Sequence, residues 1–284
     1  MASMRDIKKR KNSIQSTQQI TKAMKLVSTV KLQRAKARAE QSKAYFNCMY
    51  ATVSSMLAKA NGINHPYLNG SDSTRKAVIV ITSNRGLAGG YNTNITKLIT
   101  NGELNKDDLD IYAVGSKGRD ILSRRGYKVK ADLSELSEEP VFEQAASLAR
   151  TLLQEFKDGN IGEIYLVYTA FKGMVTHIPT QIKLLPVVAG ENTVDDLNGA
   201  IMNFEPEEEE ALELIIPKYI ASLIYGGLVE SVASENGARM QAMESATSNA
   251  GDMISSLELL YNRARQGAIT QELTEIIAGA EAIS

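Results

Sequence analysis

The chain has 284 residues, of which 43% are hydrophobic and 23% charged, so it is long enough for one large folded domain or two. Its single cysteine, Cys48, excludes an intrachain disulfide, and the lack of any run of about 18 apolar residues argues against a membrane-spanning segment. Residues 1–43 contain twelve Lys or Arg and two acids, whereas residues 205–284 contain fourteen Asp or Glu and four Lys or Arg. The ends therefore carry complementary charge, and we expect them to pair as an antiparallel rod.

The first predicted element is a long helix over residues 3–60, because neither Pro nor Gly occurs before Gly62. Apolar residues recur every three to four positions and indicate one buried face. They are Ile7, Ile14, Ile20, Met24, Val27, Val30, Ala35 and Ala39. Such a helix spans roughly 85 Å, which is wider than most domains, so part of it has to pair with another helix.

The basic residues of this segment leave nucleic-acid binding open as an alternative. Against it, no aromatic residue precedes Tyr45 in the basic stretch and no recognised DNA- or RNA-binding motif occurs. The basic, acid-poor start also resembles a mitochondrial transit peptide, but the pattern continues for forty residues as a helix. We favour a solvated helix face that meets an acidic partner helix.

The middle of the chain alternates between strand and helix patterns. Residues 76–82, 110–114, 163–171 and 181–188 read as strands, and helices are expected from about Asn92, from Gly115 to Arg125, and over 140–157. This alternation predicts a small doubly wound, Rossmann-like sheet.

Two Gly-rich turns in the middle, at 85–90 and 115–118, invite a nucleotide-binding interpretation. Neither has the spacing of G-x-G-x-x-G or of a P-loop, so we interpret both as strand-to-helix turns. The two histidines, His65 and His177, have no Cys or carboxylate at ligand spacing, and no G-x-S-x-G motif is present. The sequence therefore predicts neither a catalytic site nor a cofactor or metal site.

The last segment, residues 205–284, predicts a second long helix with a period of about 3.5 residues over about seven heptads. The expected core positions are Tyr219, Ser222, Gly226, Val229, Ala233, Asn236, Met240, Met243, Thr247, Ala250, Ile254, Leu257, Tyr261, Ala264 and Ala268. Many of these side chains are small, which permits close approach of two helices but buries little apolar area. The end from Ile269 to Ile283 is apolar for a free terminus, which suggests burial in a collar supplied by another protein.

Four stretches resemble the gamma subunit of F-type ATP synthases of the bacterial type, in order and over essentially the whole chain. They are IKKRKNSIQSTQQITKAMKLVS at 7–28, TSNRGLAGGYN at 82–92, SENGARMQAM at 234–243 and NRARQGAITQELTEIIAGA at 262–280. The resemblance implies a coiled coil of helices 1–60 and 205–284 and an α/β domain over 61–204. It also implies a non-catalytic central-stalk rotor that couples proton flow through the c-ring to ATP synthesis or hydrolysis.

The resemblance further implies roles for individual residues. The positions that match contacts of the shaft with the alpha/beta hexamer are Met24, Arg239, Arg265, Gln266, Thr270, Glu272 and Glu275. Phe204 and Glu207 fall where the foot of the family meets the c-ring and the epsilon subunit. With one cysteine, the chain lacks the dithiol of chloroplast relatives, so thiol control is not expected.

The implied partners are the alpha, beta and epsilon subunits and the c-ring, with no nucleic acid and no bound nucleotide. The N-terminus favours a bacterial protein, placed on the cytoplasmic side of the cell membrane through its complex. Two alternatives remain: a nucleic-acid-binding coiled-coil protein, and a small α/β enzyme with helical extensions.

Overall fold

The computed structural model describes residues 3–59, 65–70, 73–174, 176–187 and 208–281. The chain divides into two compact units, which we call the coiled-coil unit (residues 1–28 and 240–284) and the α/β unit (residues 29–239). Two long helices, α1 (Met4–Lys59) and α6 (Glu208–Glu281), contribute to both units. Both helices were expected from the sequence.

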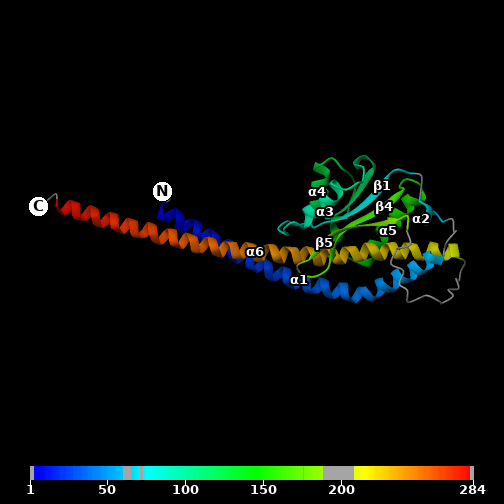
Figure 1. The fold of residues 1–284 in the computed structure, drawn as a ribbon, viewed down its shortest axis with the longest axis horizontal. Coiled ribbons are helices and arrows are strands. Elements are labelled where there is room, and N and C mark those ends of the chain that lie inside the picture. The colour runs from blue at the N-terminus through cyan, green and yellow to red at the C-terminus, as the bar shows by residue number, and fades with distance from the viewer. Residues whose placement is uncertain (1–2, 60–64, 71–72, 175, 188–207, 282–284) are drawn as a thin grey trace. The chain divides into compact units, whose positions relative to one another are not determined.

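In the coiled-coil unit, α1 and α6 pair in antiparallel fashion (Figure 1). Lys11 Nζ lies 2.8 Å from Glu258 Oε1, and Lys25 Nζ lies 2.6 Å from Glu244 Oε1. A residue later on α1 therefore pairs with a residue earlier on α6. On α6 the buried residues Met243, Ala250 and Leu257 are separated by seven. Half-buried residues lie between them, at 240, 247, 254 and 261. The predicted heptad pattern of α6 is therefore confirmed in this unit.

The face of α1 that meets α6 differs from the predicted one. Ile7, Ile14, Thr21 and Ser28, again seven apart, are buried or half-buried. By contrast, Ile20, Val27 and Val30 are 60%, 57% and 49% exposed, so the prediction that they belong to the paired face was wrong. The physical reason is that small polar residues fill part of this face, as where Thr21 Oγ1 lies 2.7 Å from Thr247 Oγ1, and apolar periodicity does not detect them.

The α/β unit is built on a five-stranded sheet in the order β3-β2-β1-β4-β5. The strands are β1 (Lys76–Ile81), β2 (Leu109–Val114), β3 (Lys128–Asp132), β4 (Glu163–Phe171) and β5 (His177–Leu185). The first four run parallel, and β5 returns antiparallel to β4. From β1 the chain adds β2 and β3 on one side of the sheet, and it then adds β4 on the other side of β1. The position between β1 and β4 is therefore the topological switch point of a doubly wound fold.

Helices cover both faces of this sheet, which confirms the doubly wound architecture. On one face, α3 (Tyr91–Thr100) and α4 (Ser116–Arg124) pack on Val78, Val80 and Ile111. The other face carries α5 (Phe142–Lys157), the short α2 (Pro66–Asn69), and the parts of α1 and α6 that belong to this unit. The central strand β1 is buried on both faces, as its unbroken Val/Ile run predicts.

Two strand predictions needed correction. Strand β3 was not predicted; it is a short edge strand in which Lys128, Lys130 and Asp132 alternate with apolar residues. The last strand begins at His177 rather than at 181, because it forms a hairpin with β4. Two 3₁₀ turns, η1 (Lys106–Asp108) and η2 (Ser134–Ser137), complete the unit.

Contrary to expectation, one helix, α6, has the length and composition of a membrane-spanning segment. Its most apolar window has a mean hydropathy of 1.4, but 56% of that window is buried inside the protein. A core helix has the same properties, so this observation is weak evidence for a membrane span.

Candidate functional site

Side-chain hydrogen bonds hold the Gly-rich loop between β1 and α3. Ser83 directly follows the loop's first residue, and its N–H donates to Asn92 Oδ1 over 2.9 Å. Asn92 Nδ2 donates back to Ser83 Oγ over 2.8 Å, and Ser83 Oγ lies 2.6 Å from the Arg85 carbonyl, to which it donates. Leu87 adopts a left-handed conformation with φ of 62° and is 63% exposed. The loop therefore holds a defined, locally strained backbone that presents Arg85 and Leu87 to solvent.

The N-terminal amides of α4 are donors of the kind that bind phosphate at other helix N-termini. Here they are already hydrogen-bonded within the chain. Ser116 N–H donates to Asn84 Oδ1 (3.0 Å), Lys117 N–H to the Ser83 carbonyl (3.1 Å) and Gly118 N–H to Thr82 Oγ1 (2.9 Å). The second Gly-rich turn therefore ties α4 to the loop after β1, which supports its interpretation as a strand-to-helix turn.

Helix α6 packs over the carboxyl ends of β1 and β4, where ligands bind in open doubly wound sheets. Thr169 on β4 donates its N–H to Ser231 Oγ over 3.4 Å, and Ser234 Oγ donates to the Thr169 carbonyl over 3.1 Å. Glu230 Oε2 accepts the Phe171 N–H over 3.0 Å. The ligand-binding position of such a sheet is thus covered by the chain's own helix.

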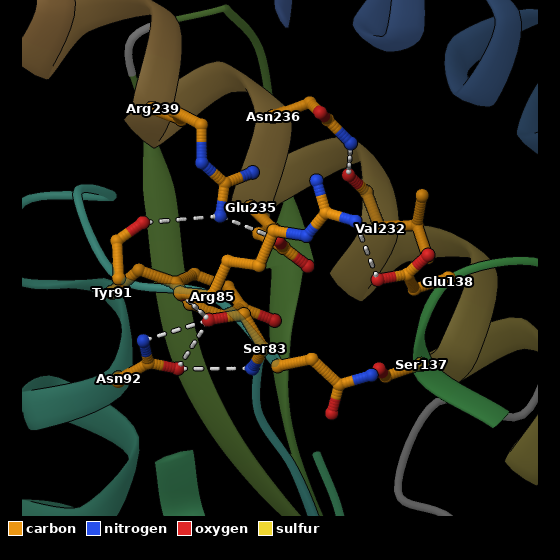
Figure 2. A network of polar contacts seen from close by, with 12 residues as sticks. Ser83, Arg85, Tyr91, Asn92, Ser137, Glu138, Val232, Glu235, Asn236 and Arg239 are labelled. Carbon is orange, nitrogen blue, oxygen red and sulfur yellow. Dashed lines mark hydrogen bonds and ion pairs between the residues drawn. The ribbon is translucent and has the colours of Figure 1, made fainter. Parts of the chain in front are cut away.

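Arg239 connects α6 to the Gly-rich loop (Figure 2). Its Nη2 donates to Glu235 Oε1 over 2.7 Å and to the Gly86 carbonyl over 3.4 Å. The side chains of Arg239 and Glu235 are only 11% and 15% exposed. From the same loop, Arg85 Nη2 lies 3.6 Å from Glu138 Oε1. Charged groups therefore tie the loop to α6 and to the segment that precedes α5.

Burial governs the electrostatics of this network. It raises the pKa of Glu235 above its ordinary value, while the neighbouring Arg239 opposes that rise. Burial also raises the pKa of Tyr91, whose hydroxyl donates to the Ser231 carbonyl over 3.3 Å. Because Arg239 is the close cation beside a buried carboxylate, removing either partner leaves the other charge poorly compensated.

Both histidines occupy structural positions. His65 Nδ1 accepts the Tyr67 N–H over 3.2 Å and caps α2. His177 stacks on Phe171 with ring centroids 6.1 Å apart and lies against Gly237, where an added Cβ would come within 2.6 Å of its Cε1. Burial lowers the pKa of both imidazoles. Among the described residues, no group of three or more His, Cys, Asp or Glu is placed to hold a metal ion.

The predicted coupling residues lie at separate places. Met24 is half-buried on α1 in the coiled-coil unit, and Arg239 is bonded in the α/β unit as described above. The remaining five are exposed on the last turns of α6: Arg265, Gln266, Thr270, Glu272 and Glu275. Thr270 Oγ1 donates to the Gln266 carbonyl over 2.9 Å. The predicted foot residues Phe204 and Glu207 lie outside the described residues.

The coiled-coil unit also presents apolar side chains to solvent. On α6, Ile269, Leu273, Ile276 and Ile277 follow the spacing of one helix face and are 49–67% exposed. They lie on the part of α6 that extends beyond the N-terminal end of α1 (Figure 1). This apolar tip is the surface that the predicted collar would cover.

Sequence reasoning identified Arg239 but missed the residues that hold it. Glu235 precedes Arg239 by four positions, a spacing that favours an ion pair on one helix face. That spacing was a usable signal in the SENGAR stretch. The contact of Arg239 with Gly86 was not visible in the sequence, because it joins residues 153 positions apart.

Comparisons with known proteins cover the whole chain. A family model described as ATP synthase matches residues 3–283. The ATP synthase gamma chain of Lachnoclostridium phytofermentans is 61% identical, with all of both chains covered, and that of Alkaliphilus metalliredigens is 44% identical, with 99% of this chain and 98% of the relative covered. A relative from Acetobacterium woodii, described as sodium ion specific, is 39% identical with 99% of each chain covered.

Solved structures show the same fold. A chain of the central stalk and c-ring of Tetrahymena thermophila mitochondrial ATP synthase matches with 27% identity and a TM-score of 0.61, covering 80% of this chain and 99% of that one. A chain of the Euglena gracilis mitochondrial ATP synthase rotor matches with 19% identity and a TM-score of 0.69, covering 94% of this chain and 98% of the other.

Proposed function

Because the chain belongs to the ATP synthase gamma chain family, we propose that it is the central-stalk rotor of a membrane-associated F-type ATP synthase. It is a non-catalytic subunit, and it couples ion flow to ATP synthesis or hydrolysis on other subunits. The observation that carries this proposal is the full-length match to gamma chains. The exposed large apolar side chains of the antiparallel helix pair agree with it.

The proposal extends to particular partners and places. The coiled-coil unit stands inside the alpha/beta hexamer, and the α/β unit meets the epsilon subunit and the c-ring. In domain terms, 1–60 and 205–284 form the shaft and 61–204 forms the α/β domain. The complex holds the chain on the cytoplasmic side of a bacterial cell membrane.

Contacts in the two units support this assignment. The apolar tip of α6 and the outward residues Ile20 and Val27 have the chemistry of a surface covered by a protein collar. Lys11 and Lys25 pair with acids of α6, so α1 does not present a purely basic face of the kind that nucleic acid requires. Arg265 is exposed and able to form a bidentate pair with a carboxylate of the hexamer.

Single-molecule rotation tests the proposed function. The chain is reconstituted with the alpha and beta subunits, a probe is attached to the α/β unit, and ATP is added. Unidirectional rotation of the probe during hydrolysis is expected. Steady ATP turnover without rotation would exclude the rotor function.

Arg265→Ala tests the proposed contact with the hexamer. Loss of a charge-assisted pair made during rotation should lower ATP turnover of the reconstituted complex by roughly tenfold. The nucleotide affinity of the isolated beta subunit should not change. Arg263→Ala is the matched control, because it removes an equally exposed arginine two positions away on the same helix. Equal turnover in the two variants would refute the assignment of Arg265.

A further inference from the structure

Arg239 is held from two directions by groups of different origin. One is Glu235, one turn earlier on α6, and the other is the Gly86 carbonyl of the Gly-rich loop. Both contacts use Nη2. Because a guanidinium has five N–H groups in a planar fork, fixing one nitrogen fixes the direction of the others.

The loop that supplies the second contact is itself well fixed. Ser83 and Asn92 exchange hydrogen bonds across its base, and Asn84 Nδ2 donates to the Ser134 carbonyl over 2.9 Å. Tyr91, at the start of α3, reaches α6 through its hydrogen bond to the Ser231 carbonyl. Gly86 therefore presents its carbonyl from a backbone with little freedom to move.

We propose that Glu235 is a positioning residue that, with the Gly86 carbonyl, fixes the orientation of the Arg239 guanidinium and thereby joins α6 to the Gly-rich loop. The inference rests on the proposed function, in which Arg239 contacts the alpha/beta hexamer. Neither the family resemblance nor the comparisons assign a role to Glu235.

Burial explains why Glu235 acts on Arg239 rather than merely adding a surface ion pair. The carboxylate is 15% exposed, so an Arg239 that swung away would leave a buried charge without its cation. That cost keeps the guanidinium in place beside Glu235 and the Gly86 carbonyl. Glu213 of α6 also forms an ion pair, with Lys157 of α5, but Glu213 is exposed. Loss of that pair would therefore not leave a buried charge.

The first test measures positioning directly in the isolated full-length chain. Solvent exchange of the Arg239 guanidinium protons is followed by NMR after ¹⁵N-arginine labelling, and the signal is assigned with Arg239→Lys. Glu235→Gln should accelerate this exchange by about tenfold, since a charge-assisted hydrogen bond is lost. Glu213→Gln is the matched control and should leave the Arg239 signal as it is. Unchanged exchange in Glu235→Gln would overturn the proposal, whether or not the chain is a rotor.

The second test uses the complete synthase in vesicles and measures ions transported per ATP hydrolysed, with proton and sodium uptake recorded separately. Glu235→Gln should lower this ratio by about threefold to tenfold, and Glu213→Gln should match the wild type. A wild-type ratio in Glu235→Gln would overturn the proposal. If the wild-type complex does not rotate in the single-molecule test, the proposed function is rejected. The proton-exchange rate of Arg239 in the isolated chain then decides the role of Glu235.

A charge swap, Glu235→Arg with Arg239→Glu, separates positioning from simple stabilisation. The swapped pair keeps an ion pair at the same helix spacing, so the thermal stability of the chain should recover part of what each single variant loses, while the hydrogen bond to the Gly86 carbonyl stays lost because a carboxylate cannot donate. Ion transport per ATP should stay low, because no guanidinium then occupies position 239. Full recovery of transport in the swapped chain would show that the pair is only structural.

Discussion

Gly115, which links β2 to α4, shows how one residue sets the geometry of the α/β unit. Its φ is 101°, in the left-handed region that favours glycine, and an added Cβ would lie 2.1 Å from the Thr82 carbonyl oxygen. The Thr82 hydroxyl also accepts the N–H of Gly118, the third residue of α4. The close approach therefore fixes how the turn after β2 meets the loop after β1.

Gly115→Ala should lower the free energy of unfolding of the α/β unit by about 3 kcal/mol or more, because it adds both backbone strain and a steric clash. Gly86→Ala is the control, since an added Cβ there meets nothing within 4 Å. Near-UV circular dichroism of tyrosine is a suitable measurement, because ten of the eleven tyrosines lie outside the coiled-coil unit. Similar unfolding curves for the two variants would contradict this account.

At the residue scale, the sequence singled out Arg239 from a motif but not the residues that surround it. The amides of Ser83 and Gly118, in and after the Gly-rich turns, are hydrogen-bonded within the chain. Burial of Glu235 was not predictable, since it depends on the packing of α6 against the sheet rather than on local pattern. Phe204 and Glu207 stay predictions.

At the scale of elements, a row of alternating charges crosses the sheet at the amino ends of the four parallel strands and the carboxyl end of β5. Asp110 on β2 lies 3.0 Å from Lys128 on β3 and accepts from Arg75 Nε over 3.1 Å. Glu163 on β4 lies 2.6 Å from both Lys76 on β1 and Lys183 on β5. Burial opposes ionisation of Glu163, but hydrogen bonds from Lys183, Lys76 and Tyr165 outweigh it and lower its pKa to about 2. The row therefore stabilises the strand order electrostatically.

This charge row predicts a pH dependence. Since the folded pKa of Glu163 lies below its ordinary value of 4.5, its stabilisation is fully present above pH 4.5 and is lost as the pH falls towards 2. Glu163→Gln should lower the free energy of unfolding by roughly 1–2 kcal/mol at neutral pH, allowing for solvent screening. The deficit should shrink between pH 4.5 and 2.

Denaturant unfolding at several pH values, followed by the tyrosine signal, measures this deficit. Glu103→Gln, which removes an exposed carboxylate near η1, serves as the control. A deficit for Glu163→Gln that stays constant from neutral pH to pH 2 would rule out the assigned role of this carboxylate.

The sequence predicted the strands that are paired on both sides, but it missed or misplaced the strands at the edges of the sheet. Strand β1 is an unbroken apolar run, and β4 is similarly clear, so both were found with nearly correct bounds. Edge strands β3 and β5 pair on one side only and carry Lys, Asp and Gln, which blur the strand pattern. The start of β5 is set by its hairpin with β4, a tertiary constraint that periodicity does not encode.

At the scale of the whole molecule, the complementary charges of the two ends matter less than the sequence implied. In the coiled-coil unit, the pairs Lys11–Glu258 and Lys25–Glu244 are partly exposed, and each is worth at most about 1 kcal/mol. The antiparallel pairing was predicted correctly. Its contact face on α1 was not, because apolar periodicity alone does not distinguish a face that meets α6 from one that meets another protein.

The apolar tip of α6 gives a prediction for the assembled protein. Ile276→Ser with Ile277→Ser should leave the unfolding of the isolated chain unchanged within about 0.5 kcal/mol, because both side chains are more than half exposed. Assembly with alpha and beta subunits should weaken by at least about tenfold, since two apolar anchors are lost. Titration of the hexamer measures this, with Gln271→Ala as an exposed control. Undiminished assembly of the double variant would exclude the tip as a contact surface.

The arrangement of side chains on α1 has a mechanical consequence. Apolar contacts have no preferred direction, so their energy changes little as one surface slides over another, whereas an ion pair has to break and form again at each step. Ile20 and Val27 face outward, while Lys11 and Lys25 engage α6. In the proposed assembly, a shaft with this distribution would meet low friction along Ile20 and Val27, and charged side chains such as Arg265 would set the angular resting points of a turn.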